Sequence, residues 1–345
     1  YEMIHNFIYF PDTDNGKHIK MVASYPQYFA ATKLLENIKN QRKPAGNGKG
    51  GTYFGTTGCG KSYIMLCLTR LLMRDKELAS PTVLLITDRS DLDDQLSAQF
   101  LNSRKFIGEE SIVEMESREQ LKEFLKDTAS GGVYLTTVQK FAEDFGELSN
   151  RNNIICISDE AHRTQNNLDS KTVIKDNELL TRYGFARFLH TALPDATYVG
   201  FTGTPVDATM DVFGPVIDQY TMTDSVKDGV TVRLIYDGRP AKAVLDTSKV
   251  KQIEEYYEQC LNEGSNEYQV EASKKATTNL AAIVGDDDVL DSVSDYFIEH
   301  YESRVKEGST VAGKAMFVCM NRPIAFKLYN ILKKKRPAWF EEKIT

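Results

Sequence analysis

The chain has 345 residues, of which 41% are hydrophobic and 26% charged, with a net charge of −7. This length can bury a large core and suggests two domains, or one domain with part of another, while no apolar run approaches the roughly 18 residues of a membrane span. The acidic balance argues against a protein coated in basic surface, although a local groove can still bind nucleic acid. Five scattered cysteines without a C-x-x-C pair favour reduced thiols in a cytoplasm.

The first 24 residues read as a lead-in from an upstream domain. Residues 4–10 have the composition of a strand, and residues 11–16 that of a turn. A helix is then expected from Tyr28 to Asn40, ended by Pro44 and a glycine-rich stretch at 46–51. Gln27 precedes this helix. An amide carries both a donor and an acceptor, so Gln27 could read the edge of an adenine.

Residues 55–62, Gly-Thr-Thr-Gly-Cys-Gly-Lys-Ser, match the phosphate-binding loop G-x-x-x-x-G-K-[ST] at every fixed position. A short strand at 52–54 leads into the loop and a helix at 63–74 leaves it, as the loop's mechanism requires. We expect Lys61 to supply charge to the β- and γ-phosphates and Ser62 to ligate Mg²⁺, so the predicted cofactors are ATP and Mg²⁺. The remaining predicted nucleotide contacts are Thr56, Thr57, Gly58, Cys59 and Gly60.

Strand-like and helical segments alternate through the rest of the first 200 residues. This alternation predicts an α/β fold with a mostly parallel sheet covered by helices on both faces, and ligands bind such sheets beyond the carboxyl ends of the strands. The expected strands are residues 82–87, 133–136, 154–158 and 197–201, and the expected helices are 91–101, 118–127, 138–145 and 182–193.

Asp159 and Glu160 directly follow the apolar strand at 154–158, within the tetrapeptide Asp-Glu-Ala-His. A phosphate-loop ATPase needs an acid there to hold the Mg²⁺ shell and a second to orient and deprotonate water. We therefore assign Asp159 to the metal and Glu160 to catalysis, with Lys61. His162 completes the tetrapeptide and is expected to couple nucleotide to nucleic acid.

Residues 200–205, Gly-Phe-Thr-Gly-Thr-Pro, follow the next strand. Thr202 and Thr204 could contact both the Asp-Glu segment and a neighbouring lobe. We interpret them as a link between nucleotide state and movement, although a simple Gly-Thr-Pro turn would have the same sequence.

These segments, in this order, resemble the front-half motifs of superfamily 2 helicases, with Asp159 to His162 as the DEAH box. Residues 4–7, 192–205, 220 and 228–232 narrow the resemblance to the motor (R) subunit of type I restriction-modification enzymes. The resemblance covers about residues 1–240 and resumes at 314–322, which is similar to the first strand of that family's second motor lobe.

The resemblance implies a RecA-like ATP-binding lobe at 25–240, a partly helical linker at 241–313, and the beginning of a second RecA-like lobe at 314–345. It implies a prokaryotic translocase that hydrolyses ATP to move along double-stranded DNA, working with methyltransferase and specificity subunits. The nuclease domain and the second-lobe arginine motif are expected outside these residues, so we expect this fragment alone to hydrolyse ATP weakly or not at all. Arg89 and Lys140 are the candidate contacts to the DNA backbone.

Two alternatives stay open: another superfamily 2 DNA or RNA helicase, or a nucleotide-binding scaffold without turnover for the isolated fragment. The last hundred residues carry little recognisable chemistry. Helices are expected at 250–261 and 289–303, and the acidic run 286–288 favours a helix N-terminus. The basic run 333–336 is interpreted as a solvated helix end.

Overall fold

In the computed structural model the chain forms two compact units, Tyr1–Leu234 and Ile235–Thr345. The structure describes residues 2–12, 19–87, 90–108, 112–115, 117–127, 130–137, 146–162, 171–175, 178–182, 185–205, 207–236, 284–307 and 315–340.

The first unit begins with helix α1 (Glu2–Phe7). The sequence predicts a strand over residues 4–10, and this prediction is wrong for residues 4–7. Only β1 (Ile8–Tyr9) is extended, and it pairs antiparallel with β2 (Met21–Val22). Tertiary contacts explain the helix. The Phe7 side chain is fully buried and packs against the Tyr28 ring, with 4.7 Å between ring centroids, and the Arg70 guanidinium donates to the His5 carbonyl.

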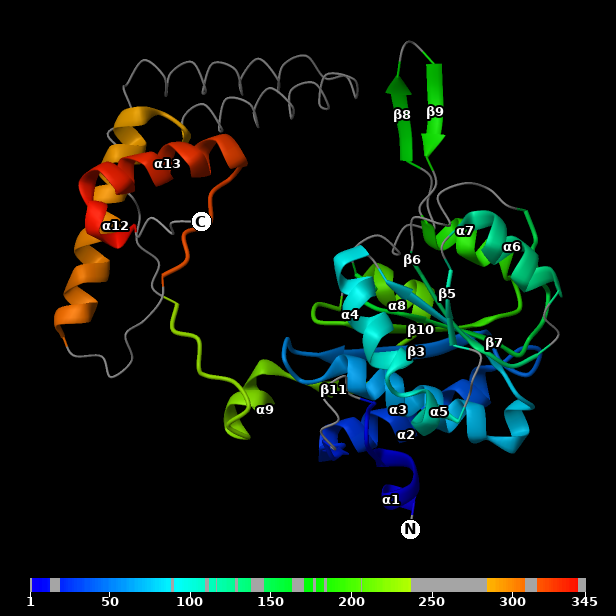
Figure 1. The fold of residues 1–345 in the computed structure, drawn as a ribbon. Coiled ribbons are helices and arrows are strands. Elements are labelled where there is room, and N and C mark those ends of the chain that lie inside the picture. Colours follow the sequence, from blue (N-terminus) through cyan, green and yellow to red (C-terminus); the bar gives the residue numbers. More distant parts are fainter. Residues whose placement is uncertain are drawn as a thin grey trace. The chain divides into compact units, whose positions relative to one another are not determined.

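Seven parallel strands form the central sheet in the order β11-β3-β10-β7-β4-β6-β5 (Figure 1). Each pair of neighbours in this sheet is parallel, which confirms the expected RecA-like α/β architecture. The strands are β3 (Lys49–Gly55), β4 (Thr82–Thr87), β5 (Ile112–Glu114), β6 (Val133–Thr137), β7 (Ile154–Ser158), β10 (Thr197–Thr202) and β11 (Val216–Tyr220).

Alternating side chains of the strands build two apolar cores. Helices lie on both faces of the sheet (Figure 1). Along β4, Val83 and Leu85 enter one core, whereas Leu84 and Ile86 enter the other. Such two-sided burial is why these strands read as continuous apolar runs. The first core is covered by α2 (Tyr25–Gln41), α3 (Lys61–Arg74), α4 (Ser90–Leu101) and α5 (Arg104–Ile107), and the second by α6 (Arg118–Asp127), α7 (Phe185–Ala192) and α8 (Asp207–Phe213).

The helix predicted at 182–193 is shorter than expected. Residue 182 belongs instead to β9 (Glu178–Arg182), which forms an antiparallel hairpin with β8 (Lys171–Lys175). The sequence does not predict strand β11, because Val-Ile-Asp-Gln-Tyr lacks a continuous apolar run. Its pairing with β3 joins residues that are distant in the chain, so no local pattern indicates it. The helices predicted at 138–145 and 250–261 lie outside the described residues.

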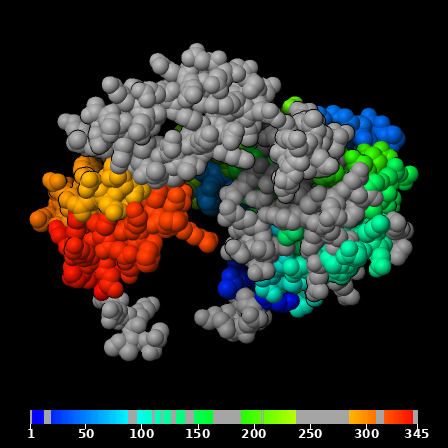
Figure 2. Space-filling view, turned by 90° about the horizontal axis from the view of Figure 1, so that it is seen from above, coloured from blue at the N-terminus to red at the C-terminus, as the bar shows by residue number. Residues whose placement is uncertain are grey.

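In the second unit, α12 (Asp287–Lys306) and α13 (Arg322–Lys335) pack together (Figure 2). As expected, Asp286 caps α12 by accepting a hydrogen bond from the Asp288 N–H. Residues 315–320, the expected first strand of a second lobe, are not assigned to a sheet, and a helix begins at Arg322.

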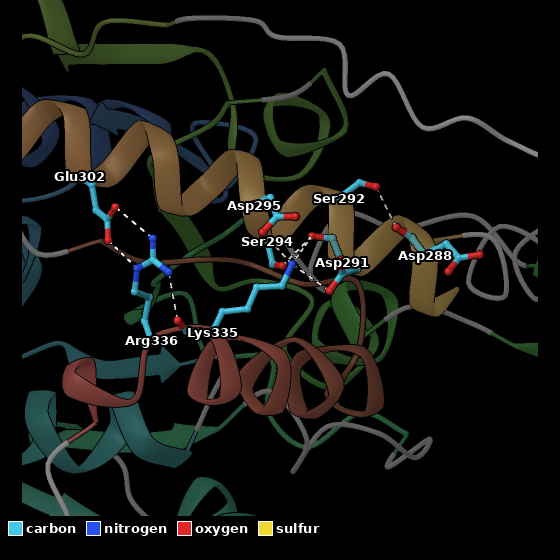
Figure 3. Close-up of polar contacts among 8 residues, drawn as sticks. All are labelled: Asp288, Asp291, Ser292, Ser294, Asp295, Glu302, Lys335 and Arg336. Carbon is cyan, nitrogen blue, oxygen red and sulfur yellow. Dashed lines mark hydrogen bonds and ion pairs between the residues drawn. The ribbon is translucent and has the colours of Figure 1, made fainter.

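The basic end of α13 is only partly solvated. Lys333 and Lys334 are exposed, as interpreted from the sequence, whereas Lys335 and Arg336 form ion pairs with α12. The Lys335 ammonium lies 2.8 Å from Asp291 Oδ1 and 2.7 Å from Asp295 Oδ1, and the Arg336 guanidinium grips both carboxylate oxygens of Glu302 (Figure 3). The reason is that α12 presents its acids at helical spacing opposite this end of α13.

Candidate nucleotide site

The phosphate loop follows β3 and ends at the first turn of α3, the strand, loop and helix arrangement that the motif needs. Gly58 and Gly60 have positive φ angles of 84° and 82°, which side chains rarely adopt. A Cβ added to Gly58 would meet no atom within 4 Å, so the loop is open at that point. Thr57 and Gly58 are exposed, Ser62 is partly exposed, and Thr56 and Cys59 are buried. Burial raises the pKa of the Cys59 thiol.

Lys61 and Gln27 lie directly against this loop. The Lys61 ammonium donates to the Gly55 carbonyl at 3.2 Å, across the mouth of the loop. The Gln27 amide nitrogen donates to the Cys59 carbonyl at 3.2 Å, and a Cβ on Gly60 would collide with that amide. The Gln27 amide oxygen accepts from the Ser24 N–H at 2.9 Å. An amide has two donors and two acceptor lone pairs, so each of its polar atoms keeps one position for a base edge.

Asp159 and Glu160 leave the carboxyl end of β7, as predicted. The Asp159 N–H donates to the Ile86 carbonyl of β4 at 2.9 Å, so the sheet ladder continues to this residue. Glu160 has a φ of +45°, an uncommon left-handed conformation for a residue with a side chain, and its N–H donates to Asp159 Oδ1 at 2.9 Å. Such conformations cluster at functional sites, where the surrounding structure imposes them.

His162 connects the Asp-Glu segment with the end of β10. Its Nδ1 lies 2.8 Å from Thr202 Oγ1, 40 residues away in the sequence, and 3.4 Å from Glu160 Oε2. The backbone reinforces this connection, because the Ala161 N–H donates to the Phe201 carbonyl at 2.9 Å. Thr204 takes part through its main chain, whose N–H donates to Thr202 Oγ1 at 3.0 Å.

The two glycines of the 200–205 segment differ in the space around them. A Cβ on Gly203 would lie 3.6 Å from the Gly55 carbonyl oxygen and 3.9 Å from Lys61 Nζ. A Cβ on Gly200 would lie 2.8 Å from the Phe213 ring, so a larger residue cannot fit there. The phosphate loop, the Asp-Glu segment and the 200–205 segment therefore form one continuous site at the carboxyl ends of β3, β7 and β10.

The sequence does not predict the contacts that the phosphate loop makes with the end of β11 and with Met222. The Thr56 N–H of the phosphate loop donates to the Tyr220 carbonyl at 3.0 Å, and Thr56 Oγ1 lies 3.8 Å from Met222 Sδ. Tyr220 contributes to the family resemblance, but nothing in the local sequence predicts its contact with the phosphate loop, to which the pairing of β11 with β3 brings it. Arg89 and Lys140, the predicted DNA contacts, lie outside the described residues.

Within the described ranges, no group of three or more His, Cys, Asp or Glu side chains could hold a metal ion. The predicted magnesium ligands Ser62 and Asp159 offer a hydroxyl and a carboxylate oxygen. Mg²⁺ commonly keeps several waters and is bound through one or two protein oxygens plus phosphate, so this set suits it. The part of the chain that the structure describes also holds no helix long and apolar enough to cross a membrane.

The family model for SWI2/SNF2 ATPases matches residues 26–270. A type I restriction enzyme HindI endonuclease subunit from Haemophilus influenzae is 33% identical over 99% of this chain and 32% of its own length. A putative type I restriction enzyme MjaIXP endonuclease subunit from Methanocaldococcus jannaschii is 31% identical, over 92% of this chain and 29% of its own length. The chain thus spans about a third of the length of these relatives.

Among solved structures, a Sulfolobus solfataricus SWI2/SNF2 ATPase core in complex with dsDNA is 13% identical, with a TM-score of 0.39, over 90% of this chain and 69% of its own. A likeness this distant says nothing about function, whereas the sequence relationships show the family. The chain belongs to the SWI2/SNF2 ATPase family and is a homologue of the endonuclease subunits of type I restriction enzymes.

Proposed function

We propose that this chain is the ATP-binding motor portion of a type I restriction endonuclease subunit, in which ATP hydrolysis drives translocation along duplex DNA before a separate nuclease domain cleaves. One observation carries the proposal. Thr202 contacts His162 of the Asp-Glu segment, and a Cβ added to its neighbour Gly203 would lie within 4 Å of the Gly55 carbonyl oxygen and the Lys61 ammonium. The 200–205 segment is therefore close to both parts of the site, and a change at the phosphates could reach it.

The residues present suit a magnesium nucleotide. The open backbone at Gly58 and the positive φ of Gly60 let anionic oxygens approach the main-chain N–H groups and the start of the 14-residue helix α3. Ser62 and Asp159 would hold Mg²⁺, and Lys61 would neutralise charge on the β- and γ-phosphates. The bound ion would supply charge stabilisation at the transferring phosphoryl group.

Glu160 is the proposed general base. Its backbone is held between β7 and the Asp159 carboxylate, so the side chain is aimed by the fold. His162 keeps the carboxylate within 3.4 Å and joins it to Thr202. Glu160 would accept the proton of the attacking water, and His162 with Thr202 and Thr204 would transmit the change to the neighbouring lobe.

The DNA and subunit partners in this proposal rest on homology. The relatives described above are endonuclease subunits of type I restriction enzymes, which supports duplex DNA as the track. The family resemblance implies methyltransferase and specificity subunits as partners. Arg89 and Lys140 remain the proposed backbone contacts.

The test is ATP hydrolysis with and without long duplex DNA, in the chain extended by a complete second motor lobe, beside Lys61→Ala. We expect DNA to stimulate turnover and Lys61→Ala to abolish it, because the γ-phosphate charge loses its closest cation. Lys33→Ala is the matched control, since Lys33 forms only a half-exposed ion pair with Asp218. If nucleotide binds but DNA changes nothing, a nucleotide-dependent scaffold replaces the motor.

A further inference from the structure

Asp228 accepts two hydrogen bonds on one oxygen, close to the point where the chain leaves the first unit. Its Oδ2 accepts from the Tyr25 hydroxyl at 2.6 Å, across 203 residues of sequence, and from the Tyr220 hydroxyl at 2.9 Å. The first of these hydrogen bonds raises the pKa of Tyr25 to about 12. The start of α2 is thereby tied to the residues that follow β11 and α9 (Met222–Lys227).

Each of the two tyrosines also leads to one end of the phosphate loop. The Tyr220 carbonyl accepts the Thr56 N–H at 3.0 Å, at the beginning of the loop. At the other end, the Cys59 carbonyl accepts from the Gln27 amide at 3.2 Å, and Gln27 shares the first turn of α2 with Tyr25. Both ends of the loop are thus connected, through one tyrosine each, to the same carboxylate oxygen.

The short helix α9 holds Asp228 in place. At its start, the Thr221 hydroxyl donates to Asp224 Oδ2 at 2.6 Å and accepts from the Asp224 N–H at 3.2 Å. At its end, the Asp228 N–H donates to the Asp224 carbonyl at 2.9 Å. Because both ends of α9 are hydrogen-bonded, the main chain sets the position of the Asp228 carboxylate.

The chain becomes exposed soon after Asp228. The N–H groups of Val230 and Thr231 both donate to the Ser225 carbonyl, at 2.9 Å and 3.3 Å. Residues 232–236 are all exposed and form no helix or strand, and the boundary between the two units falls within them. Asp228 therefore lies just before the exposed segment through which the chain passes to the second unit.

We propose that Asp228 links the phosphate loop to this exit of the chain, so that a bound nucleoside triphosphate orders residues 228–231. The proposal rests on the function given above and adds a second route, beside the contact of His162 with Thr202, by which nucleotide state reaches the rest of the motor. Phosphates that fix the loop also fix the tyrosines connected to its ends, and these hold the carboxylate. Coupling between two sites is reciprocal, so holding the exit in place also favours the loop conformation that binds nucleotide.

The test is amide hydrogen exchange, followed by NMR, on this chain with and without Mg-ATP. We expect Mg-ATP to slow exchange of the Val230 and Thr231 amides about tenfold, within the range typical of coupled sites. Asp228→Ala should abolish this slowing, while Mg-ATP still slows exchange within the phosphate loop. Asp218→Ala is the matched control and should keep both effects. Asp218 joins β11 to α2 as well, but through an ion pair with Lys33 rather than through the two tyrosines.

The two phenols are tested by variants that keep the rings. Tyr25→Phe and Tyr220→Phe each leave one of the two connections, so each should keep part of the slowing at Val230 and Thr231. The double variant should match Asp228→Ala, and adding Asp228→Ala to it should change nothing more, because the hydrogen bonds are already gone. Loss of the slowing in Asp228→Ala but not in the double variant would overturn the proposal, since capping of α9 would then explain it.

Other outcomes separate the link from the proposed function. If Mg-ATP binds but leaves the Val230 and Thr231 amides unchanged, the link is refuted while the nucleotide site stands. Equal slowing in Asp228→Ala and the unsubstituted chain refutes it too. Faster exchange throughout the first unit of Asp228→Ala, including β4, would make Asp228 a purely structural residue and overturn the link. If calorimetry finds no binding of Mg-ATP, the proposed function itself fails and the link falls with it.

Discussion

Two glutamates, one in each unit, are paired with a basic side chain in different ways. Glu160 lies 3.4 Å from His162 on a backbone with a φ of +45°, at the end of a buried strand. Glu302 forms two hydrogen bonds with Arg336, of 2.6 Å and 3.1 Å, between two ordinary helices. The second pair has the better geometry for holding structure together. The position of Glu160 is instead fixed by its backbone, as the base role proposed above would require.

The surroundings of the two pairs explain this difference. All residues of β4, β7 and β10 are buried, and main-chain hydrogen bonds from Asp159 and Ala161 extend the sheet into the site. Between α12 and α13 the described core is small, with Leu290, Ile298, Ile324 and Leu328 buried, and charged side chains supply much of the remaining contact (Figure 3). Rigid main chain positions a reactive group more accurately than flexible side chains do.

The largest expected effect separates the two glutamates by function. Glu160→Gln should lower ATP turnover by about a hundredfold to ten-thousandfold, because the amide cannot accept the proton of water. Glu302→Gln is the matched control and should leave turnover unchanged. Both are measured by phosphate release in the chain extended by a second lobe, and nucleotide binding should persist in both. Equal turnover in the two variants would contradict the proposed base role of Glu160.

Strand β7, which precedes Asp159 and Glu160, is expected to be tightly packed. Ile157 is fully buried near the carboxyl end of β7. Ile157→Ala should lower the free energy of unfolding by about 2–5 kcal/mol, through lost burial and the cavity left behind. Val232→Ala, at a position 82% exposed, should change it little. Urea unfolding followed by circular dichroism measures both, and a loss below 1 kcal/mol for Ile157→Ala would show that the strand is less tightly packed than described.

Thr202 and Thr204 provide a finer test within the site. Thr202→Val removes the oxygen that contacts both His162 Nδ1 and the Thr204 N–H, so about 1–3 kcal/mol of stability should be lost. Thr204 contributes its main-chain N–H to this contact, so Thr204→Val should keep the stability of the unsubstituted chain. Similar urea midpoints for the two variants would refute this asymmetry.

The smallest expected effect is the dependence of stability on pH that comes from the pair of Glu302 and Arg336. The hydrogen bond from Arg336 holds the pKa of Glu302 below its ordinary value. A lowered folded-state pKa means that the pair contributes stability above the ordinary glutamate range and loses it as the pH falls through the folded pKa. Carboxylate NMR titration should show this low pKa, and Arg336→Gln should return it to the ordinary range.

Lys327→Gln serves as the control for that titration, because Lys327 pairs with Asp287 rather than Glu302. It should leave the Glu302 pKa unchanged. Added salt should weaken the Arg336 effect, since both groups are partly exposed. An unaltered Glu302 pKa in Arg336→Gln would mean that another group holds the carboxylate.

Much of the first unit could be predicted from local sequence. The strands at 82–87 and 154–158 have the predicted bounds, because residues buried on both faces of a parallel sheet form apolar runs. The helix predicted at 118–127 is also confirmed. The start of the chain was misread, because residues 4–7 have strand-like composition but are helical where Phe7 packs into the core.

The sequence by itself determined the phosphate loop, the Asp-Glu pair after β7 and the α/β class, since each depends on residues close together in the chain. The tertiary structure decided which of these residues touch. It placed Gln27 over Gly60, His162 against Thr202, and Asp228 between Tyr25 and Tyr220. These contacts depend on the order of strands in the sheet, where β3 lies between β10 and β11. That order follows from the packing of the whole unit, and no local pattern in the chain encodes it.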